Sequence, residues 1–237
     1  MIHNPNSLIG HQGRCFDLRF FNQNNDSQEN LLLSASEDGT AKLWNTKAKK
    51  CLHTFQHNKS SEVLRANFLC LPDGTSEKLC TAGSDGKAVI WKYGPEEKPS
   101  VIHNISHQSE ESQIYVCETN PAEPQHLLTA ADNHLYLWDI EHSSYSKAHN
   151  WEFFVSDEKG THFGGAERNP NAESYVFDAK WSPDTPNLLT VILSDNTMKL
   201  IDIRTKEAIS LSFPVEVYSE EQSNSIKLGH PTSVRSF

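Results

Sequence analysis

Paired cysteines are the first feature that this sequence lacks. Its five cysteines are spread along the chain without a CxxC pair, at Cys15, Cys51, Cys70, Cys80 and Cys117. Zinc knuckles and thiol redox motifs need such close pairs, so the spacing argues against both. We therefore expect the cysteines to be reduced thiols in the core of the protein.

Long apolar runs and basic clusters are also missing. The first residues form no apolar signal segment, and no apolar run approaches the length that spans a membrane. We therefore expect a cytoplasmic or nuclear protein without a membrane partner. Acidic residues outnumber basic ones by 31 to 21, which gives a net charge of −10. Nucleic-acid binding is a poor candidate function, because phosphate contacts need clustered Lys and Arg.

The sequence does contain one hairpin-length motif in four copies. The copies read LLSASEDGTAKLW at 32–44, LCTAGSDGKAVIW at 79–91, LLTAADNHLYLW at 127–138 and, more divergently, LLTVILSDNTMKLI at 188–201. Each is an apolar run of strand length, a tight turn with Asp-Gly or Asp-Asn, and an alternating run that ends at a bulky residue. This order predicts a β-hairpin.

The copies recur at a regular interval. Trp44, Trp91 and Trp138 lie 47 residues apart, and the equivalent Ile201 follows after 63. A single hairpin is marginally stable in water, so the four must bury their faces against one another or against further strands. The spacing predicts one all-β repeat array, with a polar, Gly-rich surface loop inserted before the fourth unit.

Histidines add a family resemblance to the repeat. One precedes each of the first three hairpins and another stands near the end, in the dipeptides Gly10-His11, Gln56-His57, Ser106-His107 and Gly229-His230. With the terminal tryptophans, this pattern resembles the WD-repeat (beta-transducin-like) family of β-propellers, whose blades are four-stranded sheets around a central channel. The resemblance implies a single all-β propeller portion over 1–237, with blades at about 10–56, 57–106, 107–160 and 174–213 and the first strand of a fifth at 229–237.

The last residues, GHPTSVRSF, resemble the start of a further blade. Thirty-three residues lead from His11 to Trp44, but 7 follow His230. Because complete propellers have about 4 to 8 blades, we expect an incomplete propeller, the N-terminal portion of a longer one. The alternative is a four-bladed ring with a spare strand at each end.

The resemblance assigns the repeated polar residues a structural role. In this family a loop His, a Ser or Thr of the second strand, the turn Asp and the Trp N–H form a buried hydrogen-bonded chain, because buried polar groups need partners. By position the chains are His11, Ser34, Asp38 and Trp44 in blade 1; His57, Thr81, Asp85 and Trp91 in blade 2; and His107, Asp132 and Trp138 in blade 3. There we expect the shorter turn to displace Thr129. Blade 4 has Val191, Asp195 and Ile201 instead, so we expect no such chain in it.

Catalysis and metal binding are weaker interpretations of the same residues. Ser34, His11 and Asp38 could compose a hydrolytic triad, but the trio recurs in each intact blade, as expected of a structural device rather than of an active site. Two histidine pairs have the spacing of a helical metal site, yet they lie where strands meet loops and four residues do not share a face: His53 with His57, and His103 with His107. We expect no enzyme activity, no metal and no cofactor.

Members of such a family generally act as platforms for other proteins, and rigid scaffolds carry their binding residues on loops. The hairpin turns and the loops that precede the inner strands share one face in this architecture. We expect a partner to bind there through Arg14, Glu37, Ser84, Ala131, Ser194 and the insertion around Phe163 and Arg168. The alternative for the insertion is a tolerated disordered loop.

A sharper hypothesis concerns the end of the fourth hairpin. Leu200-Ile201-Asp202-Ile203-Arg204 resembles the Asp-x-Arg ending of repeats that dock onto the adaptor of cullin-4 ubiquitin ligases. The resemblance implies a substrate receptor in which Asp202 and Arg204 contact the adaptor. Ile201 departs from the aromatic residue of that pattern. The alternative is that Asp202 and Arg204 pair with each other across a strand end, which stabilises little when exposed.

Overall fold

The computed structural model describes residues 7–21, 31–69, 77–95, 97–107, 112–120, 122–140, 146–153, 174–195 and 197–211. These residues form strands, turns and bends. Within them no helix is long and apolar enough to cross a membrane. The predicted strand at 229–237 and the insertion with Phe163 and Arg168 lie outside the described residues.

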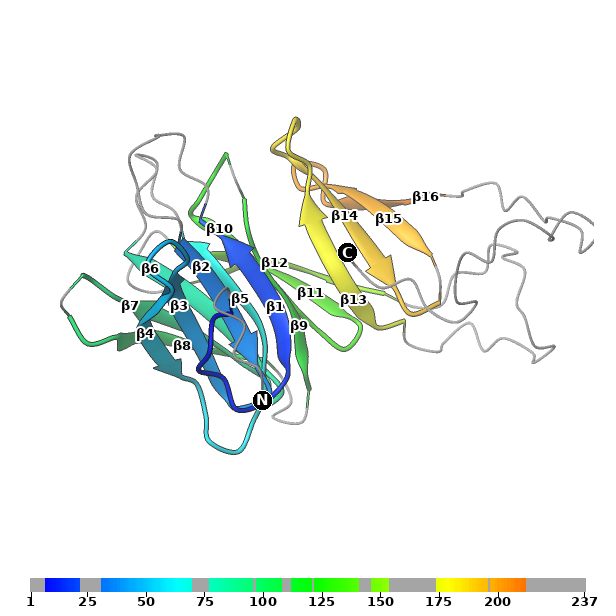
Figure 1. The fold of residues 1–237 in the computed structure, drawn as a ribbon. Coiled ribbons are helices and arrows are strands. Elements are labelled where there is room, and N and C mark those ends of the chain that lie inside the picture. The colour runs from blue at the N-terminus through cyan, green and yellow to red at the C-terminus, as the bar shows by residue number, and fades with distance from the viewer. Residues whose placement is uncertain are drawn as a thin grey trace, which may run out of the picture.

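Four antiparallel sheets of four strands each make up the described chain, and in each sheet the strands pair in chain order (Figure 1). Blade 1 contains β1 (Cys15–Phe20), β2 (Leu31–Ser36), β3 (Thr40–Asn45) and β4 (Lys50–Gln56). Blade 2 contains β5 (Val63–Leu69), β6 (Lys78–Gly83), β7 (Lys87–Lys92) and β8 (Ser100–Ser106). Blade 3 contains β9 (Ile114–Thr119), β10 (His126–Ala131), β11 (His134–Asp139) and β12 (Ser146–Glu152). Blade 4 contains β13 (Val176–Trp181), β14 (Leu188–Leu193), β15 (Met198–Asp202) and β16 (Glu207–Leu211).

The repeated motif forms the central hairpin of every blade, and the all-β class is confirmed. In blades 1 and 2 the turn ends at a glycine with positive φ, Gly39 at 77° and Gly86 at 69°. The shorter turn of blade 3 places Asp132 at a φ of 51° instead. Glycine tolerates this backbone region without cost, and Asp and Asn tolerate it better than most other residues.

Strand register is the same in all four central hairpins. The first buried residue of the second strand pairs with the bulky residue that ends the third, as in Leu32 with Trp44 and Leu127 with Trp138. The motif of blade 3 is one residue shorter than those of blades 1 and 2. Because the strand register is kept, the turn and not the strands is shortened.

Each blade has two apolar faces. We call the face toward the preceding blade in the chain the upstream face and the face toward the next blade the downstream face. Three hydrophobic cores fill the joints between consecutive blades. In the first joint, Leu33 and Phe55 of blade 1 pack with Phe68 and Leu79 of blade 2. The blades are thus held together by burial of apolar surface from both partners.

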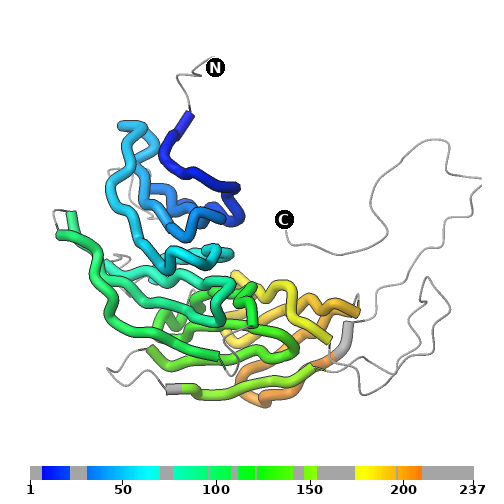
Figure 2. Tube along the Cα trace, turned by 90° about the horizontal axis from the view of Figure 1, so that it is seen from below, coloured from blue at the N-terminus to red at the C-terminus, as the bar shows by residue number. Residues whose placement is uncertain are grey.

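Blades 1 and 4 stand at the two ends of a curved array (Figure 2). On the upstream face of blade 1, Leu18 and Phe20 remain 58% and 71% exposed, so blade 4 does not cover them. The four-bladed closed ring considered above is therefore not formed by the described residues. The inner strands β1, β5 and β13 line a hollow of about 350 Å³ on the concave side.

Candidate interaction surface

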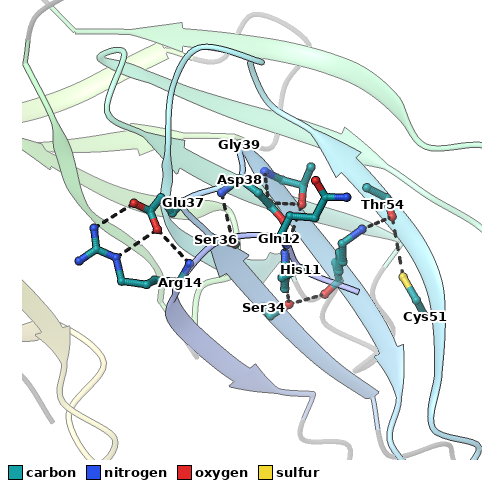
Figure 3. A network of polar contacts seen from close by, with 12 residues as sticks. His11, Gln12, Arg14, Ser34, Ser36, Glu37, Asp38, Gly39, Cys51 and Thr54 are labelled. Carbon is teal, nitrogen blue, oxygen red and sulfur yellow. Dashed lines mark hydrogen bonds and ion pairs between the residues drawn. The ribbon is translucent and has the colours of Figure 1, made fainter. Parts of the chain in front are cut away.

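A chain of hydrogen-bonded side chains, which we call the relay, stabilises blade 1 (Figure 3). Trp44 Nε1 donates to Ser34 Oγ at 2.8 Å, Ser34 Oγ lies 2.7 Å from His11 Nε2, and His11 Nδ1 lies 2.9 Å from Asp38 Oδ2. Because the carboxylate only accepts, His11 carries its proton on Nδ1 and accepts the Ser34 proton on Nε2. Every member then has a partner. Hydrogen bonds from Thr40, Gln12 and His11 outweigh burial and hold the pKa of Asp38 well below its usual value.

Blade 2 repeats the relay with the imidazole ring turned over. Trp91 Nε1 donates to Thr81 Oγ1 at 2.9 Å, His57 Nδ1 lies 2.8 Å from the same oxygen, and His57 Nε2 lies 3.0 Å from Asp85 Oδ1. Burial raises the pKa of Asp85, but hydrogen bonds from His57 and Asn58 reverse that effect and lower it to about 2. The side chain of Thr81 is fully buried.

Blade 3 corrects one expectation. Thr129 is not displaced: its Oγ1 accepts from Trp138 Nε1 at 2.8 Å and lies 2.8 Å from His107 Nε2. Asp132 is the residue that leaves the relay, because the turn is shortened beyond Thr129 while the register from Trp138 is kept. Asp132 is hydrogen-bonded to Ser112 instead. His107 Nδ1 is consequently buried without a hydrogen-bond partner.

Blade 4 has apolar residues in place of the relay. Val191 and Ile201 are fully buried in the joint with blade 3. Asp195 accepts from the backbone and hydroxyl of Thr197 within its own turn, at 3.0 and 2.6 Å. Packing therefore replaces hydrogen bonding as the means of fastening this blade.

The orphaned imidazole of His107 predicts a pH-dependent stability. Burial, helped by the charges of His134 and Lys147, lowers the pKa of His107 to about 4, so its protonation favours the unfolded chain. Stability from this group is complete above about pH 6.5 and is lost as the pH falls toward 4. We expect about 1–2 kcal/mol less unfolding free energy at pH 5 than at pH 7.5 from this group. Urea unfolding at both pH values should give a smaller difference in unfolding free energy for His107→Gln than for the wild type. An unchanged difference would contradict the assignment of this pH dependence to His107.

The hairpin turns and the residues that precede the inner strands lie together in three blades. The backbone N–H groups of Glu37, Ser84 and Ser194 donate to the carbonyls of Arg14, Glu62 and Tyr175 at 2.8–3.0 Å. We call this surface the turn face. Four of the predicted contact residues belong to it: Arg14, Glu37, Ser84 and Ser194.

Arg14 and Glu37 form a fork on the turn face (Figure 3). The guanidinium Nη2 and Nε lie 2.9 and 3.1 Å from the two carboxylate oxygens. The Arg14 side chain is 76% exposed. Hydrogen bonds from its side chain and backbone lower the pKa of Glu37 to about 2, so the pair stays charged at neutral pH.

Ala131 does not belong to this surface, contrary to expectation. It is 3% exposed and packs in the core between blades 2 and 3. The reason is again the shorter turn of blade 3, which ends the strand at Ala131 itself and keeps its side chain inside the joint. It is therefore not available to a partner.

The sequence pattern did not predict the aromatic residues on the turn face. Tyr175 is 47% exposed and precedes β13, and Phe177 is 36% exposed at a β-bulge of that strand. Phe16 occupies the equivalent bulge of β1 and lines the hollow. A bulge re-aims one side chain out of the strand alternation. The position of a bulge depends on how the strand pairs with the next one. The sequence pattern did not reveal this pairing.

A charged cluster borders the hollow, to whose lining it contributes Arg19 and Lys180. Glu118 of β9 is hydrogen-bonded to Arg19 of β1, to Lys180 of β13 and, at 3.3 Å, to Asn67 of β5. Burial lowers the pKa of Arg19, but the charges of Glu118 and Asp17 more than offset this and raise it overall. One carboxylate thus links the inner strands of all four blades.

A family model described as "WD domain, G-beta repeat" matches residues 4–45 and 49–92. Its second match begins before β4 and ends with β7. The second sequence repeat therefore combines the outer strand of blade 1 with the first three strands of blade 2. The chain thus carries two WD repeats within residues 4–92, and its four four-stranded blades have the fold expected of such repeats.

Three curated proteins are similar to this chain at low identity. The chain is 24% identical to the guanine nucleotide-binding protein subunit beta of Solanum tuberosum over 209 residues, 87% of this chain and 49% of that protein. It is 22% identical to the striatin homolog of Dictyostelium discoideum over 162 residues, 63% of this chain and 19% of that protein. A WD repeat-containing protein of the same organism, AAC3, is 24% identical over 170 residues, 56% of this chain and 35% of that protein. The chain spans less than half the length of each of these relatives.

The surroundings of the suspected triad residues, Ser34, His11 and Asp38, indicate a structural role. Ser34 is 2% exposed, and its hydroxyl oxygen already accepts from Trp44. A nucleophile must reach a substrate atom, and this oxygen is enclosed by the blade. Within the described residues no group of three or more His, Cys, Asp or Glu side chains is arranged to hold a metal ion.

Asp202 and Arg204 form a local pair at the end of β15 in blade 4. Arg204 Nε lies 3.0 and 3.2 Å from the two Asp202 carboxylate oxygens, and the arginine side chain is 65% exposed. Hydrogen bonds from Arg204 lower the pKa of Asp202 to about 2. The fork leaves the opposite edge of the guanidinium directed away from its own carboxylate.

Proposed function

We propose that this WD-repeat chain is a non-catalytic platform that binds other proteins through its turn face. The observation that carries the proposal is the pair of exposed aromatic side chains, Tyr175 and Phe177, held at the start of an inner strand. Tyr175 directly precedes β13 and Phe177 lies on it. Aromatic and Arg side chains are enriched at protein interfaces. Arg14, which lies 6.0 Å from the centre of the Phe16 ring, adds a charged contact to the same face.

The comparisons support this class of function. The potato relative is named as the beta subunit of a guanine nucleotide-binding protein, which makes it a component of an assembly. The polar relays of the first three blades are used for internal fastening, so the groups that could perform chemistry already have structural partners. We also propose a cytoplasmic or nuclear location, which the free thiols of Cys15, Cys51, Cys80 and Cys117 support.

Affinity capture from cell extract tests the turn face. The double variant Tyr175→Ala, Phe177→Ala removes two apolar anchors that are already partly exposed, so its fold should be preserved. We expect recovery of specific partners to fall at least about tenfold, as loss of interface anchors does. Val101→Ala, at a 50% exposed position of the outer strand β8, is the matched control and should recover the same partners as the wild type. Equal recovery by the double variant and the control would refute the turn face as the binding surface.

The alternative proposal is a substrate receptor that docks on the adaptor of a cullin-4 ubiquitin ligase. Its support is the exposure of Arg204 beside Asp202 at the end of β15. The same capture experiment separates the two proposals through the variant Arg204→Ala. A receptor should recover the adaptor with the wild type and lose it with Arg204→Ala, whereas a platform of another kind should recover partners unaffected by this change.

A further inference from the structure

Arg65 differs from the other basic side chains that border the hollow. It lines the hollow together with Arg19 and Lys180. Those two are paired with the carboxylate of Glu118, whereas Arg65 Nη1 donates to the backbone carbonyl of Leu64 at 3.1 Å. Within the described part of the chain, no ion pair joins Arg65 to a carboxylate.

The remaining donors of Arg65 are open to solvent. An arginine has more N–H donors than this one contact with a carbonyl uses. Among the described residues, some nitrogens are enclosed without a hydrogen-bond partner, as in Arg19 and His107, but none of them belongs to Arg65. The guanidinium can therefore donate a pair of hydrogen bonds to a carboxylate of another molecule.

The two aspartates of the hollow already have donors. Asp17 accepts from the backbone N–H of Ala66 at 3.2 Å, and Asp178 accepts from that of Ala179 at 3.0 Å. Arg65 stands at the same register position in blade 2 as these aspartates in blades 1 and 4. Because the aspartates repel a further anion, the hollow suits one carboxylate directed at Arg65 and not a dense acidic cluster.

Aromatic side chains accompany Arg65 in the two neighbouring blades. Phe16 of blade 1 lines the hollow with it. In blade 3, burial and the charge of Asp132 raise the pKa of Tyr115, and the nearby charge of Arg65 opposes that rise. Both aromatic residues stand at a β-bulge of their inner strand. Arg65 is the third residue of β5, which begins beside Glu62 of the turn face.

The arginine does not owe its surroundings to the ends of the blade array. Arg65 belongs to blade 2 and Tyr115 to blade 3, and each of these blades packs against a neighbour on both sides. The charge and the ring beside it are therefore features of the interior of the array.

We infer that the turn face binds an extended segment of a partner protein in which a carboxylate side chain stands next to an aromatic or large apolar residue. The carboxylate pairs with Arg65, and the apolar residue packs on Phe16 and Tyr115. The inference rests on the proposed function and adds the chemistry of the partner. The hollow, at about 350 Å³, is as large as pockets of about 300–1,000 Å³ that hold small ligands, so a few side chains of the segment fit into it.

Selection of short random peptides displayed on phage against the wild-type chain tests the inference. We expect the selected peptides to share an acidic residue next to an aromatic or large apolar one. Their dissociation constants, measured by fluorescence polarisation, should rise at least about tenfold with Arg65→Gln, which removes a charge-assisted contact. Lys47→Gln is the matched control: it removes an exposed positive charge between β3 and β4, and binding should not change.

A peptide with an amide in place of the carboxylate gives a second test that leaves the protein intact. It should bind the wild type at least about tenfold more weakly than the parent peptide. Arg65→Gln should weaken this amide peptide little further, because the two changes remove the same contact. Glu62→Gln should tighten binding of the parent peptide, since the charge of Glu62 acts on Tyr115 in the opposite sense to that of Arg65 and repels a carboxylate bound there.

Two outcomes would overturn the inference and leave the proposed platform standing. The selected peptides could lack an acidic residue, or acidic peptides could bind Arg65→Gln as tightly as the wild type, while the double variant Tyr175→Ala, Phe177→Ala weakens them. If neither Arg65→Gln nor the double variant weakened any selected peptide, the turn face would be refuted as well. A selection that enriches no peptide would also overturn the inference, and the capture of partners from cell extract would then decide the platform by itself.

Discussion

Replacing Phe55 with alanine is expected to reduce the free energy of unfolding by about 3–5 kcal/mol, the range for deleting a buried aromatic ring. Phe55 is fully buried in the joint between blades 1 and 2. Its ring centre lies 5.7 Å from that of Trp91 and 5.9 Å from that of Tyr93, with edge-to-face geometry in both pairs. The variant therefore leaves a cavity in a joint and removes two aromatic contacts across it.

Urea unfolding followed by tryptophan fluorescence measures this loss, because Trp91 lies next to the cavity. Leu52→Ala on the same strand is the matched control: Leu52 is 37% exposed, and its truncation should cost about 1 kcal/mol or less. Phe55→Leu keeps most of the apolar volume and should fall between the two. If Phe55→Ala were no more harmful than Leu52→Ala, the joint would not be the main source of cohesion between these blades.

Replacing Gly39 with alanine is expected to destabilise the chain by roughly 3 kcal/mol or more. Two causes act together. The φ of 77° at Gly39 strains any side chain, which costs about 1–3 kcal/mol. A Cβ at this position would also lie 2.3 Å from the Asn58 carbonyl oxygen and 2.9 Å from that of Ser61, and overpacking costs about 1–3 kcal/mol. Both oxygens are backbone atoms, so no side chain can move aside.

Gly94→Ala provides the control for this prediction. A Cβ at Gly94 would meet the Glu97 side chain at 3.6 Å, an ordinary contact, so little destabilisation is expected. The carbonyl of Gly39 also accepts from the backbone N–H of His57 at 3.1 Å, so the strained turn is tied to the start of blade 2. Thermal and urea unfolding should show that Gly39→Ala is far less stable than Gly94→Ala. Equal stability of the two would show that the turn of blade 1 can shift away from blade 2.

The relay residues of blades 1 and 2 could be predicted because the sequence resembles WD repeats and a fixed interval places the matching residues at the same points of successive sheets. The misplacement of Thr129 in blade 3 came from counting along the chain from the turn. Strand pairing counts from Trp138 instead, since hydrogen-bond register holds the two strands and the turn absorbs the missing residue. Periodicity alone does not distinguish a deletion in a turn from one in a strand.

The charged cluster in the hollow was beyond sequence reasoning for a different reason. Arg19 and Glu118 are 99 positions apart, and each looks like an ordinary polar residue of an alternating strand. Their contact arises because the inner strands of separate blades converge on the concave side. The exposure of Phe177 was likewise not predictable, because it follows from a β-bulge that the pairing of β13 with β14 produces.

The sequence by itself determined the repeating unit with its strands and turns, and its resemblance to WD repeats predicted the polar relays of blades 1 and 2. These depend on side chains that alternate along a strand or stand a few residues from a turn, so the order of residues is enough. Only the tertiary structure decided which faces of the blades are covered and which stay bare. Leu18 and Ala66 occupy the same register position, and whether that position is buried depends on the presence of a neighbouring sheet, which no local pattern specifies.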